Sequence, residues 1–211
     1  MSVGRPGTVV GADNVARRRE AGRMFDIDQF LADCREAGAE PEPKRAIRDV
    51  LERAMAEPDE VASALHPTRS GFTVLDGSPD LTVLHVVWAP HMSIYPHDHR
   101  MWAAIGIYAG QEDNSFYRRS GPDRRELTES GGKQLVTGDV VMLGDDTIHA
   151  VTNPRDRLTG AIHVYGGDFV NQPRSQWGPG ERVERPYDID QALSQFTDAN
   201  RALDVTAEPP A

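Results

Sequence analysis

The chain has 211 residues, the size of one domain with extensions or at most of two very small domains. Acidic residues outnumber basic ones by 33 to 23, and no basic stripe follows the first 25 residues, which argues against binding to nucleic-acid phosphates. No apolar stretch approaches the ~20 residues that span a bilayer, and the start of the chain lacks the apolar core of a secretory signal. We therefore expect a cytoplasmic protein that binds a small molecule and neither nucleic acid nor membrane.

The single cysteine, Cys34, excludes an internal disulfide and a cluster of thiolate ligands. Residues 1–24 show no hydrophobic period and predict a flexible leader.

The residues after this leader predict a helical N-terminal layer over residues 25–68. Its first helix is expected to begin at Asp26 as N-cap, with Gln29 completing a capping box and Phe25 packing on Phe30. Apolar residues at helical spacing, and a proline in the first turn of one segment, predict two further helices. These are expected over Pro43–Met55 and Glu60–Leu65.

From Gly71 the pattern changes to alternating or continuous β-rich segments, separated by turn residues every eight to twelve positions. The expected strands are Thr73–Leu75, Leu81–Trp88, His97–Ala109, Ser115–Arg119, Lys133–Val136, Val140–Leu143, His149–Thr152 and Gly160–Tyr165. This spacing is typical of an all-β sandwich or barrel, which we place at residues 69–170. Residues 171–211 predict a tail with a short amphipathic helix that begins at Asp188, so the chain forms one globular domain overall.

Three histidines carry the metal hypothesis. His97 and His99 are two residues apart, so both imidazoles lie on one face if this segment is a strand. The segment from Gly138 to His149 predicts a strand, a tight turn and a returning strand. A barrel that brings His149 beside the first pair supplies three neutral imidazoles and leaves coordination positions open for substrate and oxygen.

A second pair of polar side chains lies in the last predicted strand of the barrel. Alternation places His163 and Tyr165 on one face and the apolar Ile162 and Val164 on the other. An imidazole and a phenol at this spacing are suited to relay a proton or to position oxygen near the metal, so both are candidate catalytic residues.

Taken together, these residues resemble the two motifs of the cupin superfamily: His97-Asp98-His99 the first, and Gly138-Asp139 with His149 and Asn153 the second. The His163 and Tyr165 pair is similar to that of its thiol dioxygenase branch, which includes cysteine and 3-mercaptopropionate dioxygenases. The resemblance covers roughly residues 72–169. It implies a mainly β fold, a double-stranded β-helix (jelly-roll) barrel between N-terminal helices and a C-terminal helix. It also implies ferrous iron on three histidines and addition of both oxygen atoms to a thiol sulfur.

The sequence departs from this family at several positions. The ordinary cupin motif has a glutamate a few residues after the histidine pair, whereas Arg100, Met101, Trp102 and Ala103 follow His99 here, which favours three histidine ligands without a carboxylate. Ala104 and Ala161 stand where relatives have a cross-linked cysteine and a serine. The family's arginine for a substrate carboxylate belongs near residue 72, where Arg69 is the best candidate. Trp102 is a candidate to line the substrate pocket.

Other functions fit the same motifs. Zinc, manganese or nickel in place of iron suits an isomerase, a hydrolase or an oxygenase of a substrate without sulfur. A cupin that binds a small ligand without catalysis is a third alternative. The sequence leaves open whether the protein is a monomer or a homodimer.

Overall fold

The computed structural model describes residues 24–124, 126–178 and 183–207. The predicted leader therefore lies, except for Met24, outside the described residues. The helices are α2 (Ile27–Gly38), α3 (Pro43–Met55), α4 (Pro58–Leu65) and α5 (Ile189–Ala207). The strands are β1 (Gly71–Gly77), β2 (Thr82–Trp88), β3 (Ser93–Asp98), β4 (Ala103–Ala109), β5 (Gln111–Ser120), β6 (Glu126–Val136), β7 (Val140–Leu143), β8 (Ile148–Thr152), β9 (Thr159–Tyr165), β10 (Ser175–Gln176) and β11 (Arg185–Pro186). Over these ranges we find no helix with the length and apolar character of a membrane span.

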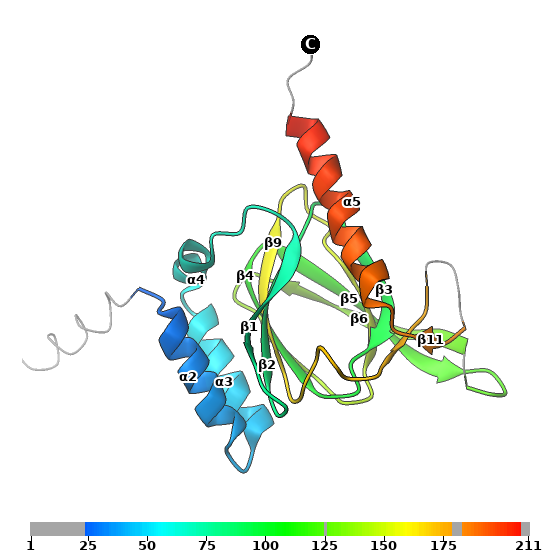
Figure 1. Ribbon diagram of the computed structural model, residues 1–211, viewed down its shortest axis with the longest axis horizontal. Helices are drawn as coiled ribbons and strands as arrows, with labels where there is room; N and C mark the ends of the chain where they lie inside the picture. The colour runs from blue at the N-terminus through cyan, green and yellow to red at the C-terminus, as the bar shows by residue number, and fades with distance from the viewer. Residues whose placement is uncertain (1–23, 125, 179–182, 208–211) are drawn as a thin grey trace, which may run out of the picture.

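Two antiparallel sheets face each other and enclose the core (Figure 1). One has the strand order β1-β2-β9-β4-β7 and the other the order β11-β10-β3-β8-β5-β6. From β2 to β9 the chain repeatedly passes from one sheet to the other, which is the winding of a jelly roll, or double-stranded β-helix. The mainly β class expected from the sequence is therefore confirmed.

Alternation along each strand divides the core into two parts. On β4, Ala103 and Ile105 point into the barrel, whereas Ala104 and Tyr108 point toward the N-terminal helices. On β9, Ile162 and Val164 join the outer cluster, as the sequence pattern predicted. Alternate residues of β4 and β9 therefore face the barrel interior, where the site lies, and the residues between them face the N-terminal helices.

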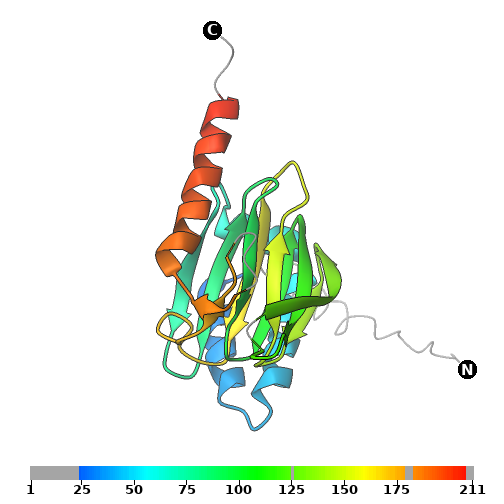
Figure 2. The same ribbon diagram turned by 90° about the vertical axis from the view of Figure 1, so that its right-hand side faces the viewer.

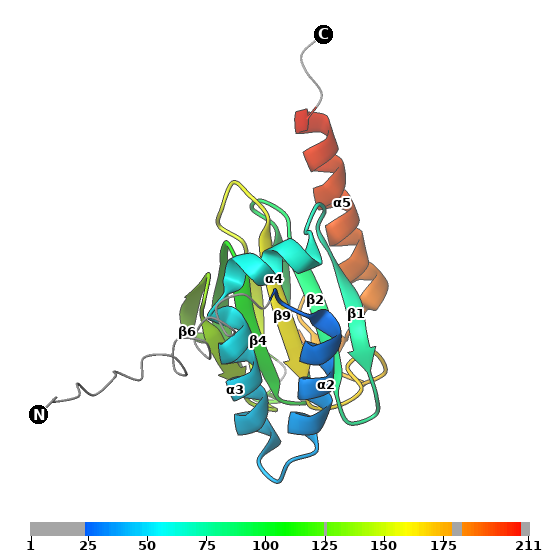
Figure 3. The same cartoon turned by 90° about the vertical axis from the view of Figure 1, so that its left-hand side faces the viewer.

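Helices α2, α3 and α4 cover the outer face of the five-stranded sheet (Figure 3). Asp26 is the N-cap of α2, as predicted, and accepts hydrogen bonds from the backbone N–H groups of Asp28 and Gln29 at 3.0 and 3.1 Å. The rings of Phe25 and Phe30 pack 5.4 Å apart, which confirms the predicted contact. The capping box is wrong, because the Gln29 side chain donates to Asp33 one turn later.

Helix α5 runs along the open side of the barrel and projects beyond it (Figures 1 and 2). It spans 19 residues and is therefore longer than the short helix expected from the sequence. Its N-cap is Asp188, whose carboxylate accepts from the Gln191 backbone at 3.0 Å. Phe196 packs against Phe72 and stacks on Trp88, with ring centroids 5.9 and 5.5 Å away. The C-terminal helix therefore closes the barrel with an apolar side chain.

The expected single strand from His97 to Ala109 is wrong. β3 ends at Asp98, the chain turns, and β4 begins at Ala103 in the other sheet. Arg100 occupies this turn with a left-handed backbone (φ 57°), and its guanidinium is held by Asp98 at 2.6 Å. His99 therefore reaches the barrel interior from a turn and not by alternation within a strand.

The turn also determines where Trp102 lies. Its indole packs directly on Gly166, in the cluster between the sheet and the helices, and not against the barrel interior. A Cβ on Gly166 would overlap this indole, so only glycine permits the contact.

We expect Gly166→Ala to destabilise the protein by about 1–3 kcal/mol, because the added methyl group forces the large, partly buried indole of Trp102 to move. Urea unfolding measures the effect. Gly167→Ala is the matched control, since its Cβ would meet only the flexible end of Met101, 3.2 Å away. Equal loss of stability in both variants would contradict this packing.

Candidate metal centre

Three buried histidines converge inside the barrel. His97 on β3 and His149 on β8 are direct partners in the register of the two strands, and His99 follows the end of β3. The Nε2 atom of His99 lies 3.2 Å from Nε2 of His97 and 3.2 Å from Nε2 of His149. The sequence prediction that these three residues come together is therefore matched by the structure.

Hydrogen bonds on the far side of two rings orient the lone pairs. Nδ1 of His97 lies 3.0 Å from the carbonyl oxygen of Tyr95, and Nδ1 of His149 lies 2.6 Å from Oδ1 of Asn114. Carbonyl and amide oxygens only accept hydrogen bonds. Each Nδ1 therefore carries the proton, and each Nε2 presents a lone pair to the centre. This is the tautomer that a metal ligand requires.

The buried imidazoles strongly favour the neutral form. Burial lowers the pKa of His97 to about 4. Burial lowers the pKa of His149 and His99 well below the usual value, and the proximity of the other histidines adds to the effect. These groups can bind a cation near neutral pH without first releasing protons.

The donor set fits one metal ion. Metal–nitrogen bonds of about 2.0–2.1 Å place neighbouring imidazole nitrogens roughly 3.0–3.4 Å apart, which agrees with the observed 3.2 Å. Within the described ranges, these three histidines are the one group of potential ligand side chains close enough to hold an ion. Three neutral nitrogens suit divalent iron, zinc, manganese or nickel and leave further coordination positions open.

A cavity of about 50 Å³ adjoins the three histidines. Its walls are mostly apolar. They are formed by Phe72, Leu84, Val86, Trp88, Ile94, His97, His99, His149, Val151, His163, Tyr165, Phe169, Tyr187 and Phe196. The volume corresponds to only a few water-sized positions, which limits an occupant to a small molecule.

His163 and Tyr165 point into this cavity from β9, as the alternation predicted. Nδ1 of His163 lies 3.0 Å from the Tyr165 hydroxyl, and the Tyr165 ring packs edge-on against His99, with centroids 5.0 Å apart. Burial raises the pKa of Tyr165, so its phenol stays protonated. The pair therefore places an O–H group beside the metal ligands.

The two candidate substrate residues lie elsewhere. Arg69 has a side chain 56% exposed, is bound to Asp204 of α5 at 2.9–3.0 Å and does not line the cavity. Trp102 is separated from the cavity by the sheet on which it packs. Neither residue contacts the site, because one is held by the C-terminal helix and the other faces the N-terminal helices.

Arg174 is a buried arginine that the sequence analysis missed. Its guanidinium lies between the rings of Phe169 and Tyr187, 4.1 Å from each centroid, and donates to the Phe169 carbonyl. Its Nε atom has no hydrogen-bond partner within the described residues. The positive charge adds to the effect of burial in lowering the pKa of His97, and it partly opposes burial, which raises the pKa of Tyr165. It therefore gives the site a positive potential from behind two cavity walls.

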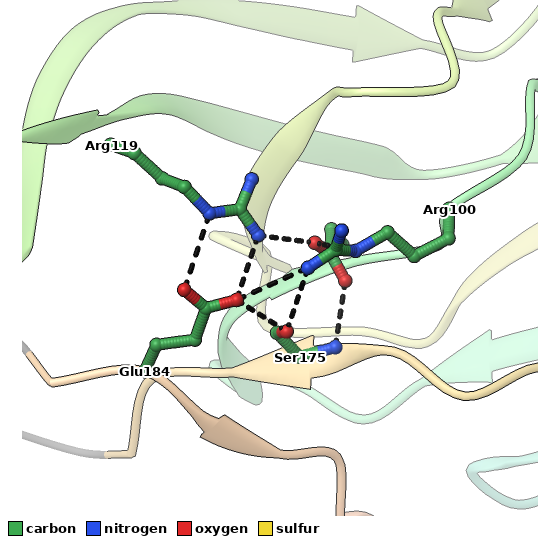
Figure 4. Close-up of polar contacts among 5 residues, drawn as sticks. Arg100, Arg119, Ser175 and Glu184 are labelled. Atoms are coloured by element: carbon green, nitrogen blue, oxygen red, sulfur yellow. Dashed lines mark hydrogen bonds and ion pairs between the residues drawn. The ribbon is translucent and has the colours of Figure 1, made fainter. Parts of the chain in front are cut away.

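A polar network joins Ser175 and Glu184 of the C-terminal segment to Arg100 and Arg119 of the barrel (Figure 4). Asp98, between two ligands, is buried and binds Arg119 at 2.8 Å and the Ser175 backbone N–H at 2.7 Å. Glu184 joins Arg119, Arg100 and the Ser175 hydroxyl at 2.9, 3.1 and 2.6 Å. Because β10 pairs with β3 opposite His97, this network fixes the strand that carries the first ligand.

No protein-family model matches the chain. Among solved structures it is similar to a cupin superfamily protein from Desulfitobacterium hafniense, at 16% identity over 50% of this chain and 87% of that one, with a TM-score of 0.40. An RmlC-like cupin with a double-stranded β-helix fold from Methanocaldococcus jannaschii gives 10% identity over 49% and 85%, with a TM-score of 0.41. A cupin 2 conserved barrel domain protein from Salinispora arenicola gives 21% identity over 44% and 72%, with a TM-score of 0.35. These three structural neighbours are cupins.

The metal-free protein is expected to lose stability as the pH falls below about 6.5, the value for histidine in an unfolded chain. Because the pKa of folded His97 is about 4, the unfolded chain binds protons in this window that the folded protein does not. Urea unfolding of chelated protein between about pH 7 and pH 5 measures the slope. His149→Gln is expected to flatten it, and an unchanged slope would contradict the account.

Proposed function

We propose that the protein is a non-heme iron dioxygenase that adds both atoms of dioxygen to the sulfur of a small thiol and releases a sulfinate. The observation that carries the proposal is the convergence of three neutral imidazole nitrogens beside a small cavity whose wall holds the His163 and Tyr165 pair. The resemblance to thiol dioxygenases at these positions supports the choice of reaction.

The reaction needs no other reductant. One thiol and one dioxygen give one sulfinic acid: the S–H and O–O bonds break, two S–O bonds form, the thiol proton passes to a sulfinate oxygen or to solvent, and sulfur is oxidised as oxygen is reduced. Ferrous iron, when bound by the three histidines, supplies binding positions for the thiolate and for oxygen. The absence of a carboxylate ligand within the described residues leaves room for both.

The side chains of the cavity have separate tasks. Tyr165 holds a protonated hydroxyl next to His99 and orients a polar ligand by a hydrogen bond. His163 contacts that hydroxyl through Nδ1 and accepts or returns its proton. Phe196 and Trp88 stack at the C-terminal helix and exclude water from the reacting sulfur.

The cavity and its charge define the substrate class. About 50 Å³ suits a thiol of a few heavy atoms. Arg174 contributes a buried positive charge behind Phe169 and Tyr187, which favours an anionic substrate over a cationic one. We therefore propose a small thiol carboxylate, and we replace Arg69 with Arg174 as the source of the favourable charge.

Metal analysis and oxygen uptake test the proposal. Anaerobically purified protein is expected to hold iron near one per chain and to consume oxygen with 3-mercaptopropionate or cysteine faster than with cysteamine, which is a cation. His149→Ala is expected to lose both metal and uptake, because it removes one of three ligands. His91→Ala is the control, since His91 is exposed and pairs with Asp156.

Two results would overturn the proposal in different ways. Stoichiometric zinc with activity under nitrogen would favour an isomerase or hydrolase. Iron without uptake across a panel of thiols would keep the metal site but exclude ordinary thiol substrates.

A further inference from the structure

Glu112 is a fully buried carboxylate on β5, 0% exposed, with no part in the motifs above. It accepts a hydrogen bond from Trp88 Nε1 at 2.8 Å and another from Asn114 Nδ2 at 3.0 Å. Its Oε2 atom also lies 3.5 Å from Nε2 of His163. Burying a carboxylate in an apolar barrel costs free energy, and these hydrogen bonds offset part of that cost.

The donors around Glu112 favour its ionised form. Burial by itself raises the pKa of this carboxyl, but the neighbouring His163 and the donors Asn114 and Trp88 outweigh it, so the pKa is lowered. An ionised carboxylate accepts hydrogen bonds and donates none. Whatever faces it must therefore be a donor.

This requirement selects the tautomer of His163. Nε2 of His163 is buried without a hydrogen-bond partner within the described residues, and the nearby carboxylate demands a proton on it. In the neutral ring Nδ1 is then an acceptor, and the Tyr165 hydroxyl donates to it across 3.0 Å. The result is a chain from carboxylate to imidazole to phenol, which resembles in logic the acid, base and hydroxyl of hydrolytic triads.

The same carboxylate also reaches the metal centre. Asn114 donates its amide N–H to Glu112 and therefore turns its carbonyl oxygen toward Nδ1 of His149, 2.6 Å away. The orientation of Asn114 in turn fixes the lone pair that His149 offers to the ion. One buried charge thus orders residues on both sides of the cavity.

We propose that Glu112 is the positioning residue of the site: it sets the His163 tautomer directly and the His149 tautomer through Asn114. For the reaction, this assignment rests on the proposed function, whereas the two tautomers do not depend on it. Ala161, on β9 two residues before His163, has no polar group to hold that ring, and Glu112 does so from the opposite sheet.

Nitrogen NMR of histidine-labelled, zinc-loaded protein tests the assignment without requiring activity. The signals of His163 are identified by their loss in His163→Gln. The expected result is a proton on Nε2 of His163, either in the neutral ring or in the doubly protonated ring. A ring protonated on Nδ1 alone would overturn the proposal, even in the wild-type protein.

Glu112→Gln keeps the shape but removes an acceptor. Because an amide has one oxygen, it cannot accept from Trp88, Asn114 and His163 together. The proton of His163 is therefore expected to move to Nδ1, or Asn114 to turn and release His149. With iron and a working thiol, kcat is expected to fall about 100-fold with little change in KM.

Asp113→Asn is the matched control, because Asp113 is the next residue on β5, faces the other side of the sheet and bonds to Gln111. It is expected to leave the spectrum and kcat unchanged. If Glu112→Gln gives the wild-type spectrum for both His163 and His149, the proposal is wrong. Expected tautomers without oxygen uptake would instead count against the proposed reaction alone.

Discussion

Three buried imidazoles whose Nε2 atoms face one another form the constraint on which the rest of the structure depends. Such an arrangement is unfavourable without a cation at its centre, because the rings are desolvated and neutral and their nitrogens are only 3.2 Å apart. The barrel tolerates it by holding two of the rings from behind. A backbone oxygen holds His97, and Asn114 holds His149.

The polar network around Asp98, the N-terminal helices and helix α5 hold the histidines in place from outside the barrel. Asp98 anchors the end of β3 through two arginines and the backbone of Ser175, so that the ligand on each side of it is fixed. The N-terminal helices bury the outer face of the five-stranded sheet. Helix α5 closes the remaining side with Phe196. Together these contacts keep the cavity small.

Features set by local pattern were predictable from the sequence. Helix starts follow from Asp26 and Pro43, and the inward direction of His163 and Tyr165 follows from strict alternation along β9. The three histidines were selected as candidate ligands because their spacing resembles a known pair of motifs, and the structure brings their nitrogens together. The left-handed turn at Arg100 was missed, since one of the two ion pairs that hold Arg100 comes from Glu184, 84 residues further along the chain.

Residues whose roles arise from contacts across the fold were not predictable. Arg69 was chosen for its position near β1, but its partner is Asp204, 135 residues away. Arg174 and Glu112 carry no local signature: one lies in the tail, and the other lies in a run of polar residues between the expected strands His97–Ala109 and Ser115–Arg119. Only the closed barrel shows that both charges are buried beside the same cavity.

X-ray absorption spectroscopy of the iron-loaded protein is the most direct test of the central claim. The account predicts that the fine structure shows three imidazole ligands for each iron, and that one is lost in His99→Ala. A first shell with fewer than three imidazoles in the wild-type protein, or one unchanged in that variant, would contradict the account.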